Sequence, residues 1–60
     1  MSAVYNPESD LMAEIERLEH EARDIRRKIE HVRNQEDKRV LNRQLQELAD
    51  QIEYLGHRLP

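Results

Sequence analysis

The sequence contains no cysteine, one glycine, two prolines and two aromatic residues in sixty positions. Without cysteine, the chain forms no disulfide and offers no thiolate to a metal ion. So few glycines and aromatics are not typical of a β-sheet protein or a collagen-like chain. No stretch approaches the roughly 20 apolar residues that a membrane-spanning helix needs, and the first ten residues lack the basic and apolar regions of a secretion signal. We therefore expect a helical, cytoplasmic protein with no membrane attachment.

Residues suited to nucleophilic catalysis or to phosphate binding are also scarce. The only serines are Ser2 and Ser9, near the N-terminus, and the chain has neither threonine nor a glycine-rich loop. Carboxylates are plentiful, but two packed helices provide no cavity that would shift their pKa values. We therefore expect a protein that is not an enzyme and that has no bound cofactor.

Charged residues make up 38% of the sequence, and the formal net charge is −3. This balance provides no overall attraction to nucleic acid or to an anionic membrane. A chain of this length forms one domain at most, and it buries only about 60% of the surface that its unfolded form exposes. Because disulfides and thiolate metal sites are excluded, oligomerisation or a binding partner is the expected source of additional stability.

Two series of apolar residues recur at alternating steps of four and three, the heptad spacing of a stripe along one side of an α-helix. Such regular spacing distinguishes the chain from a disordered polar sequence. We call these thirteen residues the apolar seam and predict that they form the helix interface. They are Leu11, Ile15, Leu18, Ala22, Ile25, Ile29 and Val32, followed by Leu41, Leu45, Leu48, Ile52, Leu55 and Leu59.

The heptad spacing is interrupted between Val32 and Leu41. Nine residues at about 100° each would place the second series on the opposite side of one continuous helix, so we predict a turn. Asn34 either ends the first helix in the left-handed conformation or caps the second helix, whose first turn holds Glu36 and Asp37.

The helix ends also have sequence signals. Asn6 is the expected N-cap of the first helix, with Pro7 in its first position and Ser9 as the alternative cap. Gly56 is expected to fray the last turn of the second helix. The expected units are a flexible arm over 1–6 and a hairpin over 7–60, with a helix over about 7–33, a turn over about 34–36 and a helix over about 36–57.

In an antiparallel hairpin, each seam residue of the first helix packs opposite one of the second helix, and the two residue numbers have a nearly constant sum. If that sum is 70, both residues of every such pair are apolar. The midpoint of this register is Gln35, inside the predicted turn. Outside the seam, the same register places Glu14 near Arg58. A parallel dimer of one long helix would instead set like charges together, as in Glu14 against Glu19. The sequence therefore favours an antiparallel two-helix hairpin of the coiled-coil type.

Two helices alone leave half of each seam open to solvent, so we expect a homodimer in which two hairpins form a four-helix bundle. The small residues Asn42, Ala49 and Gly56 permit close approach of the second hairpin. Residues 23–43 hold eight basic and four acidic residues, whereas the rest of the chain holds two basic and nine acidic. If the two turns lie at opposite ends of the bundle, the basic region of each hairpin lies against the acidic region of the other.

Three features near the surface are candidate contact sites. His20 has Glu16 and Asp24 four residues away on either side, a donor set that could hold a metal ion. Ordinary contacts on a solvated helix face explain the same spacing, and we predict no metal. Tyr54 is a possible anchor for a partner, although isolated exposed apolar residues are common. A basic group near the turn could contact phosphates, an acidic partner or a second copy, but it lacks aromatic residues for base stacking. Its members are Arg26, Arg27, Arg33, Lys38, Arg39 and Arg43.

Two families share features with this chain. The expected architecture resembles that of the small plasmid Rop proteins, which are antiparallel hairpin dimers that bind RNA; the resemblance covers the architecture and no motif. The stretch Gln46-Glu47-Leu48 is similar to the middle of a Ser-Gln-Glu-Leu-Asp signature in a family of small helical-hairpin phosphatases. Leu45 and Ala49 stand where that family has serine and aspartate, so the similarity implies no phosphatase activity.

The sequence thus predicts an all-α hairpin that dimerises into a four-helix bundle. We expect a small, non-enzymatic protein–protein interaction or regulatory module that acts as a homo-oligomer. The alternative is a nucleic-acid-binding hairpin that contacts RNA through the basic residues near the turn.

Overall fold

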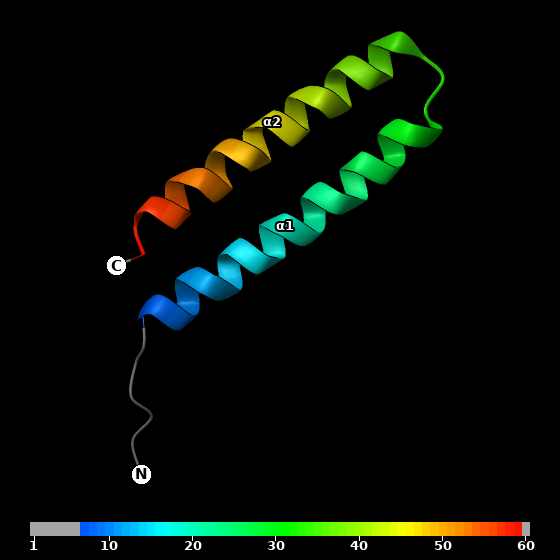
Figure 1. The fold of residues 1–60 in the computed structure, drawn as a ribbon. Helices are drawn as coiled ribbons and strands as arrows, with labels where there is room; N and C mark the ends of the chain where they lie inside the picture. The colour runs from blue at the N-terminus through cyan, green and yellow to red at the C-terminus, as the bar shows by residue number, and fades with distance from the viewer. Residues whose placement is uncertain (1–6, 60) are drawn as a thin grey trace.

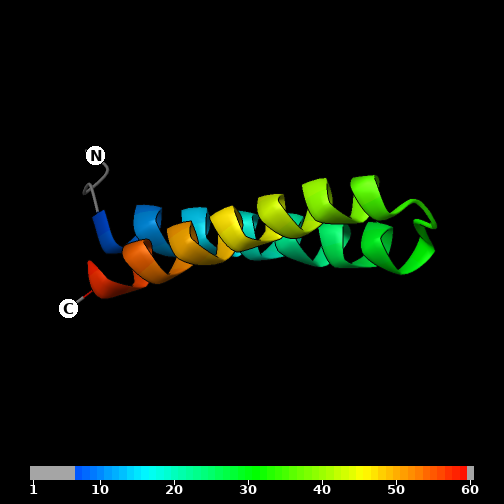
Figure 2. The ribbon, with the colours of Figure 1, turned by 90° about the horizontal axis from the view of Figure 1, so that it is seen from above.

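Two α-helices joined by a short turn form a hairpin in the computed structural model, which describes residues 7–59. Helix α1 spans Pro7–His31, and helix α2 spans Gln35–His57. The helices run in opposite directions and stay side by side from one end of the hairpin to the other (Figures 1 and 2). We call the end with the connecting turn the turn end, and the other the open end. The fold is the all-α antiparallel hairpin that the sequence predicts.

Helix α1 begins at Pro7, whose fixed φ suits the first helical position. Glu8 and Asp10 lie in the first turn of α1 and Lys28 lies in its last turn. Negative charge is favourable near the N-terminus of a helix and positive charge near its C-terminus. Ser9 lies inside α1 and is therefore not its N-cap. The predicted cap at Asn6 and the predicted arm over 1–6 lie outside the described residues.

The turn occupies residues 32–34, two residues earlier than predicted, because α1 ends at His31. The backbone N–H of Val32 still donates to the carbonyl of Lys28 at 3.0 Å. Asn34 then has an extended backbone (φ −80°, ψ 128°), and its side-chain oxygen accepts a 2.8 Å hydrogen bond from the N–H of Glu36. Of its two predicted roles, Asn34 therefore has that of N-cap to α2.

Helix α2 ends in a tightened last turn. Gly56 was predicted to fray this turn, but it lies within α2 and has no positive φ. The N–H of Arg58 donates to the carbonyl of Leu55 at 3.1 Å, and that of Leu59 to Gly56 at 3.2 Å. These bonds span three residues, which is typical of a helix terminus closing as a 3₁₀ turn. Of the two helices described, neither is long and apolar enough to cross a membrane.

The apolar seam lies along the contact between α1 and α2. Only Leu18 and Ala22 are buried, with exposed fractions of 5% and 4%, and the other eleven seam residues are half-buried. The cross-helix neighbours differ from the predicted register by one seam residue. Ala22 lines a surface hollow with Ile52, where the prediction pairs it with Leu48. Leu18 lines another hollow with Leu55, where the prediction pairs it with Ile52. Each helix therefore covers one side of its partner's seam and leaves the rest accessible.

Candidate functional site

One face of the hairpin combines small side chains with an accessible seam. At its centre is a hollow of about 340 Å³ that brings together Glu19, Ala22, Arg23, Arg26, Ala49, Ile52 and Glu53. Ala49 lies seven residues from Asn42 and from Gly56, so all three occupy the same side of α2. A Cβ built on Gly56 would meet no atom within 4 Å. We call this surface the Ala49 face.

The opposite side of the hairpin is covered by longer polar side chains. Two hollows there are lined by Glu21 with Gln44 and Gln51, and by Glu14 with Tyr54. Glu14 and Glu21 are half-buried although they are charged, because their side chains lie beside the seam. Tyr54, the suggested partner anchor, is 64% exposed. We call this surface the Glu21 face. On this face, polar side chains lie beside the accessible part of the apolar seam.

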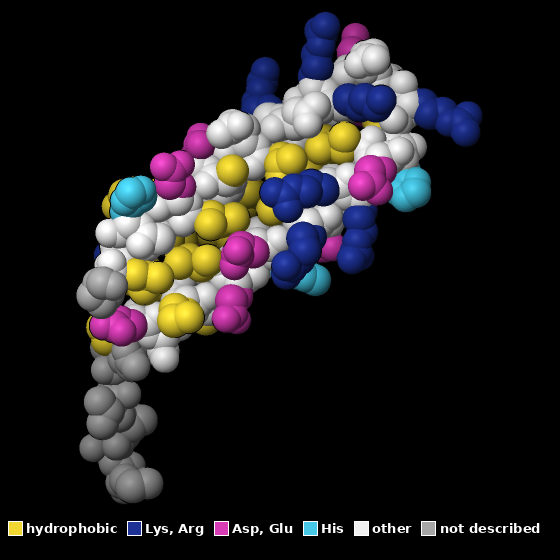
Figure 3. Space-filling model, viewed as in Figure 1, with side chains coloured by type: hydrophobic (Ala, Val, Ile, Leu, Met, Phe, Trp, Pro, Cys, Tyr) yellow, Lys and Arg dark blue, Asp and Glu magenta, His cyan; other side chains and the backbone are white. Residues whose placement is uncertain are grey.

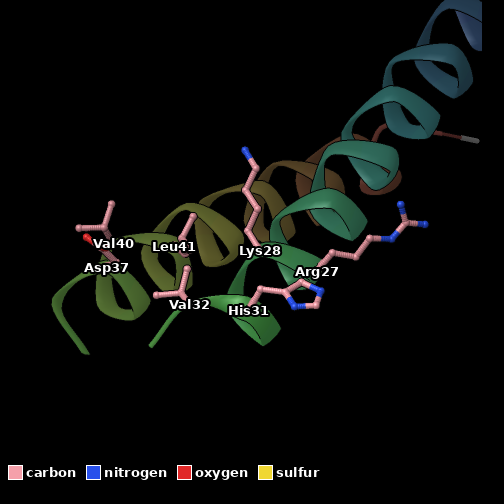
Figure 4. A pocket seen from close by; sticks show the side chains of 7 residues that line it. All are labelled: Arg27, Lys28, His31, Val32, Asp37, Val40 and Leu41. Carbon is pink, nitrogen blue, oxygen red and sulfur yellow. The ribbon is translucent and has the colours of Figure 1, made fainter. Parts of the chain in front are cut away.

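A fourth hollow, of about 510 Å³, lies at the turn end. Its apolar part consists of Val32 from the turn and Val40 and Leu41 from α2, and Val32 and Leu41 lie close together in Figure 4. Arg27 and Lys28 extend away from these apolar side chains at the rim (Figure 4). This hollow was not predicted from the sequence. The one sequence feature that could have indicated it is Val40, an apolar residue outside the seam, which is 55% exposed in the structure.

The predicted basic group gathers at the turn end. Arg26 and Arg27 lie in the last turns of α1, Arg33 in the connecting turn, and the other three in the first turns of α2. Lys and Arg side chains accordingly gather toward the turn end of the face seen in Figure 3, where apolar side chains form a band between the helices. Five of the six are exposed, and Lys38 is half-buried. They form a cationic surface open to an anionic partner.

Acidic residues predominate at the open end, where some form ion pairs on the surface of α1. Arg17 pairs with Glu14, and its Nη1 donates to Glu21 Oε1 at 2.7 Å. The hydrogen bond to Glu14 and that carboxylate's charge, followed by the charge of Glu21, raise the pKa of Arg17. Glu14 therefore does not form its predicted pair with Arg58, whose guanidinium lies 6.0 Å from the centre of the Tyr54 ring.

Two of the three histidines, His20 and His57, each lie beside one acidic side chain. His20 Nε2 lies 3.7 Å from Asp24 Oδ2, and His57 Nε2 lies 3.7 Å from Glu53 Oε1. Within residues 7–59, no three histidine or acidic side chains are arranged to hold a metal ion. The three residues considered as metal ligands, Glu16, His20 and Asp24, thus do not come together as a metal site.

Comparison with known proteins leaves the surface of the hairpin as the guide to its function. The chain matches no known family model, and neither a curated protein nor a solved structure is significantly similar to it. The features that suggest function are therefore the half-covered seam, the Ala49 face and the separation of charge between the two ends.

Proposed function

We propose that this chain is a small, non-enzymatic protein–protein interaction module that works as a helical-hairpin homo-oligomer. The observation that supports this function is the seam: eleven of its thirteen residues are only half-buried within the hairpin. Full burial of a leucine or isoleucine side chain is worth about 1.5–3 kcal/mol. A second hairpin laid on the seam would therefore add on the order of 10 kcal/mol of apolar burial.

Sedimentation equilibrium of the full chain tests this proposal. We expect a dimer, with twice the 7.3 kDa mass of the chain, at micromolar concentration. The substitution Ile52→Glu places a charge on the half-buried seam and should abolish the dimer, whereas Val40→Glu adds the same charge at a 55% exposed site outside the seam. Circular dichroism of each variant reports whether helix content changes with the mass.

The outcomes of this experiment separate clearly. A wild-type chain that stays monomeric at micromolar concentration contradicts self-association. An Ile52→Glu variant that keeps the dimer mass contradicts association through the seam. Equal loss of the dimer in Ile52→Glu and Val40→Glu would also contradict it, because a general effect of charge would then explain the result.

The cationic turn end supports a second candidate function, the binding of RNA. Six basic side chains lie there within a few helical turns, and phosphate neutralisation makes such binding weaken steeply with salt. If RNA is the ligand, affinity should fall as the salt concentration rises and disappear in the triple variant Arg26→Ala/Arg27→Ala/Arg39→Ala. Self-association that survives this triple variant would favour the protein-interaction module.

A further inference from the structure

The hollow at the centre of the Ala49 face lies halfway along the hairpin. Ala22, which lines it, is the fourth of the seven residues in the first series of the seam, and Ile52 is the fourth of the six in the second series. A two-fold rotation about an axis through this hollow would therefore pack the seam of one hairpin against the seam of a second hairpin along most of their length. The turn ends would then lie at opposite ends of the assembly.

Charges around the hollow are arranged by sign. Glu19 and Glu53 lie on the side of the open end, and Arg23 and Arg26 lie on the side of the turn end. The same two-fold rotation brings the acidic side of one copy to the basic side of the other. A two-fold interface requires this property, because the same surface must be complementary to itself.

From this geometry we propose that the Ala49 face binds a second copy of the chain, with the two turns at opposite ends and the two-fold axis through the central hollow. This inference rests on the proposed homo-oligomer and specifies its face and orientation. In the assembly, Ala49 lies close to Ala49 of the partner subunit, and Gly56 lies near Asn42 of the partner subunit. These small residues allow the two α2 helices to approach closely.

The size of the Ala49 face suits a stable dimer. A face about 35 Å long and two helices wide, at about 10 Å per helix, presents roughly 700 Å². Stable interfaces bury about 800 Å² per partner. On the Glu21 face, a second copy would first have to displace or bury Glu14 and Glu21, which are charged. The Ala49 face also carries charged side chains, but these are of both signs, and the two-fold rotation brings the acidic ones toward the basic ones of the other copy.

Charge along the whole hairpin favours the same orientation. Residues 23–43 hold four more basic than acidic residues, and the rest of the chain holds seven more acidic than basic. With the turns at opposite ends, each basic end faces an acidic end. With the turns together, like charges lie side by side.

Electron–electron distance measurement on spin-labelled dimers tests the orientation, because the chain has no cysteine of its own. We use Gln35→Cys at the turn end and, as the control, Asp50→Cys, both at exposed positions. Position 50 is level with the axis. Position 35 lies fifteen residues away along α2, about 22 Å of helix, so the two labels at position 35 should be about 45 Å apart. Turns at the same end would bring them within about 20 Å.

The control label keeps the two proposals apart. Labels at position 50 lie at the same level in either orientation, so their interaction reports only whether a dimer forms. No interaction at position 50 contradicts the proposed homo-oligomer itself. An interaction at position 50 together with a short distance at position 35 contradicts the orientation proposed here and leaves the homo-oligomer standing.

A pair of arginine substitutions tests the face. Ala49→Arg should weaken dimerisation roughly tenfold or more, because a long charged side chain overfills the close contact between the α2 helices. Gln51→Arg puts the same side chain on the Glu21 face and should leave the dimer intact. Arginine has a helix propensity near that of alanine and glutamine, so a loss of helix content in Ala49→Arg would follow from loss of the dimer and not from the propensity of the new residue. Loss of the dimer in Gln51→Arg with its retention in Ala49→Arg would overturn the assignment.

Discussion

At the scale of single residues, Asn34 determines where the chain leaves the turn and enters α2. Its side-chain oxygen accepts the N–H of Glu36, one of the backbone donors that have no partner within the helix. The next backbone bond, from Lys38 N–H to the Asn34 carbonyl at 3.1 Å, is the first of the α-helical pattern. Side chain and carbonyl of one residue thus together start the second helix.

The substitution Asn34→Ala should lower the free energy of unfolding by about 1 kcal/mol, because it removes the cap and leaves the Glu36 N–H without this acceptor. Urea denaturation followed by circular dichroism measures the change. Asn34→Asp is the matched control, because aspartate caps equally well and adds negative charge at the N-terminus of α2. A loss of similar size in Asn34→Asp would show that the cap is not the cause.

Arg17 is a residue whose contacts do little for stability. Its side chain is 57% exposed and pairs with Glu14 and Glu21, which lie on the same helix. Exposed pairs of this kind gain little in water and are screened by salt. The sequence-based expectation that Glu14 would cross to Arg58 overlooked this neighbour three residues away, which it reaches without bridging two helices.

At the scale of the helices, the seam spacing predicted the fold because it uses only intervals along the chain. Steps of four and three require an α-helix, and the nine-residue gap from Val32 to Leu41 requires the helix to break. The spacing does not fix the residue where α1 ends, because Val32 has the right interval for the seam and yet lies in the turn. Helix ends depend on individual hydrogen bonds, such as that of Asn34, which periodicity does not contain.

The surface hollows could not be predicted from spacing alone. The turn-end hollow exists because Val32, Val40 and Leu41 come from two different segments, and its shape depends on the path of the turn. The difference between the two faces depends on side-chain length: Glu14 and Glu21 reach beside the seam, while Ala49 does not. The basic group was predictable as a set, since all six residues lie close in sequence to the predicted turn.

The small residues Ala49 and Gly56 on one side of α2 lead to a prediction about the stability of the helix. Within a single hairpin, Gly56→Ala should raise the free energy of unfolding by about 0.5–1 kcal/mol, because alanine has the higher helix propensity and the added methyl group meets no atom of the same chain within 4 Å. Ala49→Gly, seven residues earlier on the same side of α2, should lower it by about 1 kcal/mol. Chemical denaturation at one fixed protein concentration compares the two. A destabilised Gly56→Ala variant would show that position 56 contacts something other than its own hairpin.

At the scale of the whole molecule, the hairpin is a thin, polar structure with one incomplete interface. Its core consists of two buried residues, and its remaining apolar groups are shared between the interior and the surface. A single hairpin of this length is expected to have marginal stability, because so little surface is buried on folding. The same incompleteness that limits the monomer provides the surface for a second copy.

If folding and association are coupled in this way, the thermal midpoint should depend on protein concentration, because dilution favours the dissociated, unfolded chains. For a dimer of this size, each tenfold increase in concentration should raise the midpoint by roughly 5 °C. Thermal melts followed by circular dichroism over a hundredfold range measure this shift. The Ala49→Arg variant is the control: it should melt at a lower temperature than the wild-type chain at each concentration, because its monomers associate less. A midpoint that does not move with concentration in the wild-type chain would mean that the hairpin is stable alone, and that its half-covered seam needs no partner.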